Sequence, residues 1–184
     1  MLDRKLLLTT KLINWSITTL SIAVCVLAMY TRLPGMTLMG IAPNWLLIWL
    51  VAWSVNRPVL LAVMAGIALG LVQDSMTVVQ ADGLNAVPTH MIGLAIASGL
   101  TSLLQKQRYV QEDFISIALI VFGMAVIVET MHAIQLVYMG SDANTIWLLH
   151  QRIALGSAIV SSLWSPVVYF PLSRWWRSLE GRED

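Results

Sequence analysis

Residues 114–139 read FISIALIVFGMAVIVETMHAIQLVYM, a run in which Glu129 is the only Asp, Glu, Lys or Arg. A helix of this length rises about 39 Å at ~1.5 Å per residue, more than the roughly 30 Å of a bilayer's hydrocarbon core. The run contains no proline, and its only glycine is Gly123. It therefore predicts a membrane-spanning α-helix.

The composition of the whole chain agrees with a membrane environment. Of 184 residues, 58% are hydrophobic and 11% are charged, against about 25% charged residues in a typical soluble domain. A soluble fold of this size buries only about 70% of its unfolded surface, so it could not hide this much apolar surface. The net charge of +1 gives no field suited to nucleic acid, and the single cysteine, Cys25, permits neither an internal disulfide nor a cysteine metal cluster.

Five further apolar segments share the chain with this run. We predict an all-α integral membrane protein of about six transmembrane helices, forming a single polytopic membrane domain over residues 1–184. The second and third segments offer only about 14 to 16 residues each, fewer than the roughly 20 needed to cross a bilayer, so they are either short spans or a re-entrant helical hairpin. The expected segments are Leu12–Tyr30, Pro43–Val55, Val59–Val72, Thr89–Leu104, Phe114–Met139 and Ile153–Phe170.

Lysine and arginine positions set the expected orientation. With the N-terminus inside, nine of these residues fall on the cytoplasmic side, and only Arg32 and Arg152 fall outside. Such an excess marks the cytoplasmic loops of membrane proteins. Both the N and C termini are therefore expected in the cytoplasm, whether or not the second and third segments cross fully.

Ionisable side chains at membrane depth are the candidate functional residues. Glu129 and His132 are one helical turn apart and share a helix face, and His90 joins them in the outer half of the protein. Such a cluster can be a proton relay, a metal site or a pocket for a cationic ligand, or it can tie helices together through hydrogen bonds, which is the interpretation we favour. The sequence has no His-x-x-x-His, Cys-x-x-Cys or Gly-x-Ser-x-Gly pattern, so we expect no metal, no cofactor and no catalytic residue.

Small residues and tryptophans mark candidate contact faces. Gly66 and Gly70 form a Gly-x-x-x-Gly face that permits close helix approach, and we favour packing within the chain over an oligomer contact. Trp45, Trp49 and Trp53 form a stripe on the second segment. That stripe is either a lipid-facing aromatic face or a docking surface for another membrane helix. A second small-residue face is formed by Ser157, Ser161 and Ser165.

The third segment and the loop after it carry a resemblance to a known family. The pattern Gly66-x-x-x-Gly70-Leu71-x-x-Asp74, followed by a loop with Gly83-Leu84-Asn85-Ala86, resembles the rod shape-determining protein MreD family. Pro88-Thr89-His90, at the opening of the next span, is similar to the cyanobacterial branch of that family. The insertion of residues 77–82 departs from the commonest loop pattern of the family.

This resemblance implies a non-enzymatic subunit of the bacterial cell-elongation machinery in the plasma (inner) membrane. Its direct partner would be an MreC-like periplasmic membrane protein, which would connect it with MreB, RodA and a penicillin-binding protein. Within that picture we expect Asp74 to cap or tether the following loop and the tryptophan stripe to face a partner helix.

An alternative comes from another class of protein. A six-span chain with short loops and a polar outer pocket also resembles the substrate-binding subunit of an energy-coupling-factor vitamin transporter. His90, Glu129 and His132 would then contact the ligand.

Overall fold

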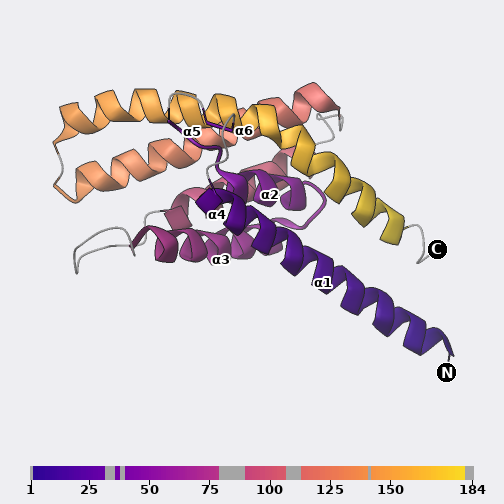
Figure 1. Ribbon diagram of the computed structural model, residues 1–184. Helices are drawn as coiled ribbons and strands as arrows, with labels where there is room; N and C mark the ends of the chain where they lie inside the picture. Colours follow the sequence, from indigo (N-terminus) through magenta and orange to yellow (C-terminus); the bar gives the residue numbers. More distant parts are fainter. Residues whose placement is uncertain are drawn as a thin grey trace.

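A computed structural model describes residues 2–31, 36–37, 40–78, 90–106, 113–140 and 142–180 of the chain. Every regular element in these ranges is an α-helix, as the sequence predicts (Figure 1). The helices are α1 (Leu2–Thr31), α2 (Trp45–Ser54), α3 (Val59–Val78), α4 (His90–Lys106), α5 (Phe114–Tyr138) and α6 (Ala143–Glu180).

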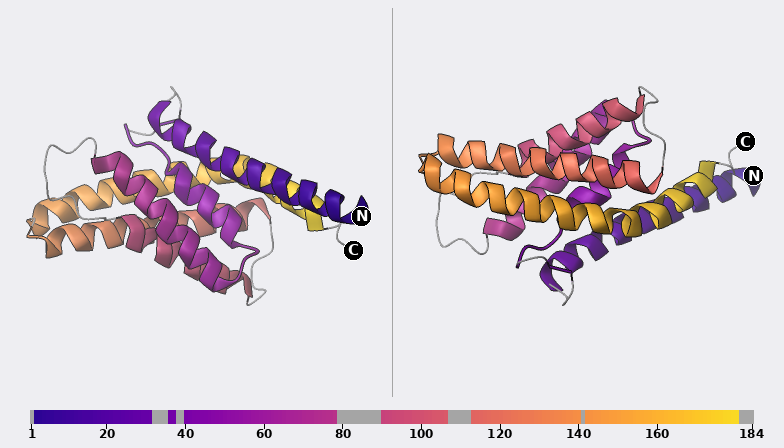
Figure 2. Two further views of the ribbon diagram at one scale, coloured as in Figure 1. Left: turned by 90° about the horizontal axis from the view of Figure 1, so that it is seen from below. Right: turned by 90° about the horizontal axis from the view of Figure 1, so that it is seen from above.

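Four of these helices, α1, α3, α5 and α6, are long and apolar enough to cross a membrane. The antiparallel pair α5 and α6 covers one side of the molecule, while α1 and α3 lie on the other (Figure 2). Both termini lie at the same end (Figure 1), which is the end that the basic residues assign to the cytoplasm. The fold is therefore an all-α, multi-pass membrane protein.

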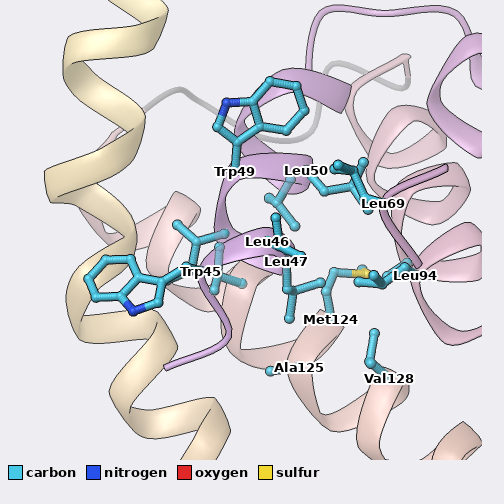
Figure 3. Packing of buried hydrophobic residues seen from close by; sticks show 14 of the residues in the cluster. Trp45, Leu46, Leu47, Trp49, Leu50, Leu69, Leu94, Met124, Ala125 and Val128 are labelled. Carbon is cyan, nitrogen blue, oxygen red and sulfur yellow. The ribbon is translucent and has the colours of Figure 1, made fainter. Parts of the chain in front are cut away.

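The short helix α2 lies at the centre of this bundle and contacts all five other helices. It is only 10 residues long, about 15 Å at ~1.5 Å per residue. Nine of its residues are buried, and only Trp53 is partly exposed. The core around it combines Leu46, Leu47 and Leu50 of α2 with side chains from α3, α4 and α5 (Figure 3).

The first turn of α2 begins inside the protein, where water cannot satisfy its free backbone N–H groups. Asn44 supplies an acceptor for one of these N–H groups, because its side-chain Oδ1 accepts a hydrogen bond from the Leu47 N–H at 3.0 Å. The Asn44 N–H in turn donates to Ser161 Oγ of α6 at 3.0 Å. Irregular backbone is tolerated at this depth because protein side chains provide its partners.

The third and sixth helices are longer than the sequence suggests. We expected the third segment to end at Val72, before Gln73 and Asp74, but α3 continues to Val78 because both polar side chains are buried against other helices. Its 20 residues match the length needed to cross a bilayer. Of the two segments expected to be short, only the second is short.

Helix α6 begins ten residues before the expected Ile153 and runs through Pro166 and Pro171 to Glu180. Proline removes the N–H that would bond the carbonyl four residues earlier, which for Pro166 is the Ser162 C=O. Ser165 Oγ donates to this carbonyl at 2.8 Å, so the hydrogen bond lost to proline is replaced by a serine hydroxyl. This explains why the helix continues through Pro166, a residue type that usually interrupts a helix.

Candidate functional site

One face of α3 packs closely along α4. A Cβ added to Gly66 would lie 2.6 Å from the Leu94 carbonyl oxygen, and one added to Gly70 would lie 2.3 Å from the Met91 Cα. Both separations are far below ordinary contact, so the two backbones meet where α3 has no side chain. The Gly-x-x-x-Gly face is thus occupied by a helix of the same chain. Leu71, next to Gly70, is exposed.

Asp74 continues this face one turn beyond Gly70 and holds the start of α4. Its carboxylate accepts hydrogen bonds from the backbone N–H groups of His90 at 2.8 Å and Met91 at 3.3 Å. The same carboxylate contacts the His90 Nδ1 at 2.7 Å. A carboxylate at a helix N-terminus satisfies free N–H groups and interacts favourably with the helix dipole. Asp74 therefore links the last turns of α3 to the first turn of α4.

His90 connects this cap to the other polar residues predicted from the sequence. Its ring centroid lies 4.6 Å from that of His132 on α5. Glu129 lies one turn before His132 on α5, and Ser157 of α6 lies beside its carboxyl group. The structure thus brings His90, Glu129 and His132 together where α4, α5 and α6 meet.

These residues line a cavity of about 200 Å³ between α5 and α6, which we call the outer cavity. Its polar residues are His90, Glu129, His132 and His150, and its apolar walls are Ala133, Leu136, Ile146, Leu149 and Ile153. His150 was not among the residues predicted from the sequence, because the sixth helix was expected to begin only at Ile153. One signal in the sequence was available: Leu149 and Ile153 have the spacing of one helix face, and His150 lies between them, so the helix could have been expected to include His150.

His150 also contacts α5 directly. Its Nε2 lies 3.3 Å from Thr130 Oγ1, and the Thr130 hydroxyl donates to the Val126 carbonyl at 2.7 Å. Because that hydroxyl proton is already used, the His150 Nε2–H must donate to Thr130 Oγ1. Among the described residues, no group of three His, Cys, Asp or Glu side chains is arranged to hold a metal ion.

The tryptophan stripe lies largely inside the protein and not on an outward face. Trp45 and Trp49 are buried. The Trp45 ring packs on Trp164 of α6 with centroids 5.6 Å apart, and the Trp49 Nε1–H donates to Ser21 Oγ of α1 at 2.8 Å. The membrane helices that cover this stripe are therefore helices of the same chain. Trp53 stacks on Trp49 at 6.0 Å and is partly exposed.

A groove nonetheless remains beside the stripe. It has a volume of about 480 Å³ and runs between α1 and α6, with Trp45 and Trp49 among its lining residues. Leu20 and Val24 of α1 and Val167 of α6 also line it, and each of these three side chains is more than half exposed. We call it the α1/α6 groove.

The loop part of the sequence pattern, Gly83 to Ala86, lies outside the described residues, as do Pro88 and Thr89. Comparison with known proteins identifies one family. The family model described as rod shape-determining protein MreD matches residues 9–174. No curated protein and no solved structure matches the chain.

Proposed function

Because this chain belongs to the MreD family of rod shape-determining proteins, we propose that it is a non-catalytic membrane subunit of the cell-elongation machinery that binds an MreC-like partner. The family is one of inner-membrane proteins, and the four long apolar helices fit a multi-pass protein of that membrane. The match to residues 9–174 carries the proposal, since it extends from α1 into the last turns of α6.

The α1/α6 groove is the candidate docking surface for the partner. A single membrane helix of an MreC-like protein would lie between α1 and α6, against the Trp45 and Trp49 rings. Large aromatic side chains at the base of a groove are typical anchors of protein contacts. Helix α1 supports this choice because it is apolar yet little covered by the rest of the chain: 6% of its candidate membrane span is buried.

Further members of the machinery would be reached through the partner. In this proposal MreB, RodA and a penicillin-binding protein associate through the MreC-like protein, and the chain itself supplies a scaffold or a modulating contact. No reaction is assigned to it.

Affinity purification in mild detergent tests the proposal. The tagged chain, taken from its native membrane, should recover a single-span periplasmic protein together with elongation enzymes. Recovery of a bound vitamin with ATPase subunits would instead support the transporter alternative.

A groove-filling variant tests the docking surface. Val24→Trp places a large ring in the groove at a side chain that is 56% exposed, so folding should be preserved. Leu119→Trp on α5 is the matched control, because Leu119 is 69% exposed and does not line the groove. Partner recovery should fall with Val24→Trp and not with Leu119→Trp. Equal recovery would place the partner on another surface.

A further inference from the structure

Arg57 lies in the connection between α2 and α3, at the end of the bundle that holds both termini (Figure 1). Its N–H donates to the Ser54 carbonyl at 3.2 Å, and its carbonyl accepts a hydrogen bond from Ser102 Oγ of α4 at 2.6 Å. Its guanidinium lies over the Trp53 ring, 5.5 Å from the ring centroid. Backbone and side-chain contacts therefore hold Arg57 where α2, α3 and α4 meet.

The Arg57 guanidinium carries a charge that the described part of the chain does not neutralise. Arg57 is partly exposed, and no carboxylate of the described residues lies within ion-pair distance of it. A guanidinium that lies over an aromatic ring still has its N–H donors, whose fork geometry matches a phosphate or carboxylate. At the cytoplasmic surface of a membrane, anions of this kind are supplied by phospholipid headgroups.

An apolar groove begins beside Arg57 and runs between α3 and α4, with a volume of about 460 Å³. We call it the α3/α4 groove. Val59, two residues after Arg57, and Leu103, next to Ser102, line its inner end. The groove extends along α4 as far as Met91, about 18 Å from Leu103 at ~1.5 Å per residue. None of the side chains that line it is polar.

The length and lining of this groove suit an acyl chain. Each leaflet supplies about 15 Å of the roughly 30 Å hydrocarbon core, so a groove of about 18 Å accommodates a chain of one leaflet. A polar ligand would lose its hydrogen bonds to water there and find no replacement. The groove and the adjacent cation together fit an amphiphile that has an anionic head and an apolar tail.

We propose that Arg57 and the α3/α4 groove form a binding site for an anionic phospholipid of the cytoplasmic leaflet. The lipid phosphate binds the Arg57 guanidinium, and one acyl chain lies in the groove. Phosphatidylglycerol represents this class, because its headgroup adds only an uncharged glycerol to the phosphate. The site lies on different residues from the α1/α6 groove, so the proposal does not depend on the partner complex.

The first experiment compares three ligands on the delipidated full-length chain in detergent. Dioctanoyl phosphatidylglycerol has an anionic head and two tails, dioctanoyl phosphatidylcholine has the same tails and no net charge, and glycerol 3-phosphate has the anion without tails. A ligand that binds only the folded state raises the unfolding temperature, so at equal concentration only phosphatidylglycerol should raise it. An equal effect of the two lipids would show a site without charge preference. An equal effect of glycerol 3-phosphate would show a site for free phosphate. Either result would overturn the proposal.

Two arginine variants assign the headgroup to Arg57. Arg57→Gln removes the charge and keeps the backbone bonds to Ser54 and Ser102. It should weaken phosphatidylglycerol binding roughly tenfold or more, as expected for the loss of one hydrogen-bonded charge. Arg174→Gln is the matched control, because Arg174 is an exposed arginine near the C-terminal end of α6, and binding should be unchanged. An equal loss in both variants would show general attraction between a positive surface and anionic lipid, and would refute a site at Arg57.

A groove-filling variant tests the apolar half of the site, and it also decides the matter if Arg57→Gln does not fold. Ile96 lines the groove and is 37% exposed, so Ile96→Trp places a large ring in it. Leu119→Trp on α5 is the control, since Leu119 is 69% exposed and lies outside the groove. Each variant is compared with itself with and without lipid, so a difference in its own stability cancels.

Phosphatidylglycerol binding should fall with Ile96→Trp and not with Leu119→Trp. Full binding by a folded Ile96→Trp protein would place the lipid on another surface and refute the assignment. If the groove instead holds a second copy of the chain, light scattering will show a dimer that Ile96→Trp converts to a monomer, while the effect of phosphatidylglycerol persists. That outcome would also overturn the proposal.

Discussion

Replacement of Gly70 by alanine tests the close α3–α4 contact most directly. The added Cβ would lie 2.3 Å from the Met91 Cα, about 1.1 Å short of the 3.4 Å at which ordinary contact begins. The obstructing atoms include backbone atoms of α4, so no change of rotamer relieves the clash, and the helices must separate. Overpacking of this kind typically costs about 1–3 kcal/mol, and a clash with backbone belongs at the upper end of that range.

Separation of the helices would also affect Asp74, which lies on the same face one turn later. Its hydrogen bonds to the His90 and Met91 N–H groups would lengthen. Alanine is more favourable than glycine inside a helix by roughly 0.5–1 kcal/mol, and this stabilisation offsets part of the cost of the clash. We therefore expect Gly70→Ala to lower the free energy of unfolding by about 2 kcal/mol or more.

Gly123→Ala on α5 is the matched control, because a Cβ at that position meets nothing within 4 Å. It should be neutral or stabilising by up to about 1 kcal/mol. The assay is unfolding in mixed micelles with increasing sodium dodecyl sulfate, followed by tryptophan fluorescence. A second variant, Met91→Ala, should not rescue Gly70→Ala, since the two closest atoms are backbone atoms. Equal stability of Gly70→Ala and Gly123→Ala would refute the close-packing argument.

Three further predictions concern polar contacts between and at the ends of helices. Asp74→Asn removes the charge that caps α4 and should destabilise the protein by about 1–2 kcal/mol; unchanged stability together with unchanged partner recovery would remove its tethering role. Trp49→Phe and Ser21→Ala each break the 2.8 Å bond between α1 and α2, and a double-mutant cycle should give a coupling energy of about 0.5–1.5 kcal/mol. A coupling near zero would mean that α1 is not held by this bond. The exposed Asp142 carboxylate accepts a hydrogen bond from Thr145, which lowers its pKa below the ordinary value of 3.8. A lowered pKa in the folded state adds stability that is present at neutral pH and is lost as the pH falls below about 3.8, through the folded pKa. The difference in thermal stability between the wild type and Asp142→Asn should therefore shrink in acid, and a constant difference would contradict this.

The boundaries of helices that are flanked by polar residues could be predicted closely from the sequence. Helix α5 begins at the expected Phe114 and ends one residue before the expected Met139, because Asp113 caps its start and Gly140, with φ of +97°, ends it. Helix α4 begins one residue after the expected Thr89. Local chemistry fixes the boundaries of α5, so no knowledge of tertiary contacts was needed there.

Other features of the helices were not predicted, and only some of them depend on contacts between distant segments. Gln73 and Asp74 look like a helix end in the sequence, yet both are buried, and Asp74 has its partners on α4. Pro166 looks like an interruption, yet Ser165 replaces its missing hydrogen bond. The position of α2 could not be predicted either, because an all-round apolar helix suits lipid and protein interior equally well.

The candidate site was predicted in part. The sequence pointed to His90, Glu129 and His132, because ionisable residues are rare at membrane depth. It could not indicate that His150 and Ser157 of α6 complete the cluster, since their depth follows from how α6 packs against α5. Burial of Trp45 and Trp49 depends on α1 and α6 in the same way.

The central position of α2 has a consequence for the order in which the protein is made. At 10 residues, α2 is too short to be inserted into the bilayer as an independent span, so it enters alongside its neighbours. The Asn44 N–H finds its acceptor on Ser161, 117 residues later in the chain. The core around α2 therefore stays incomplete until α6 has left the ribosome, and a chain truncated before Ser161 leaves a polar backbone group without its partner within the membrane. Synthesis of α6 is the step that completes the core around α2.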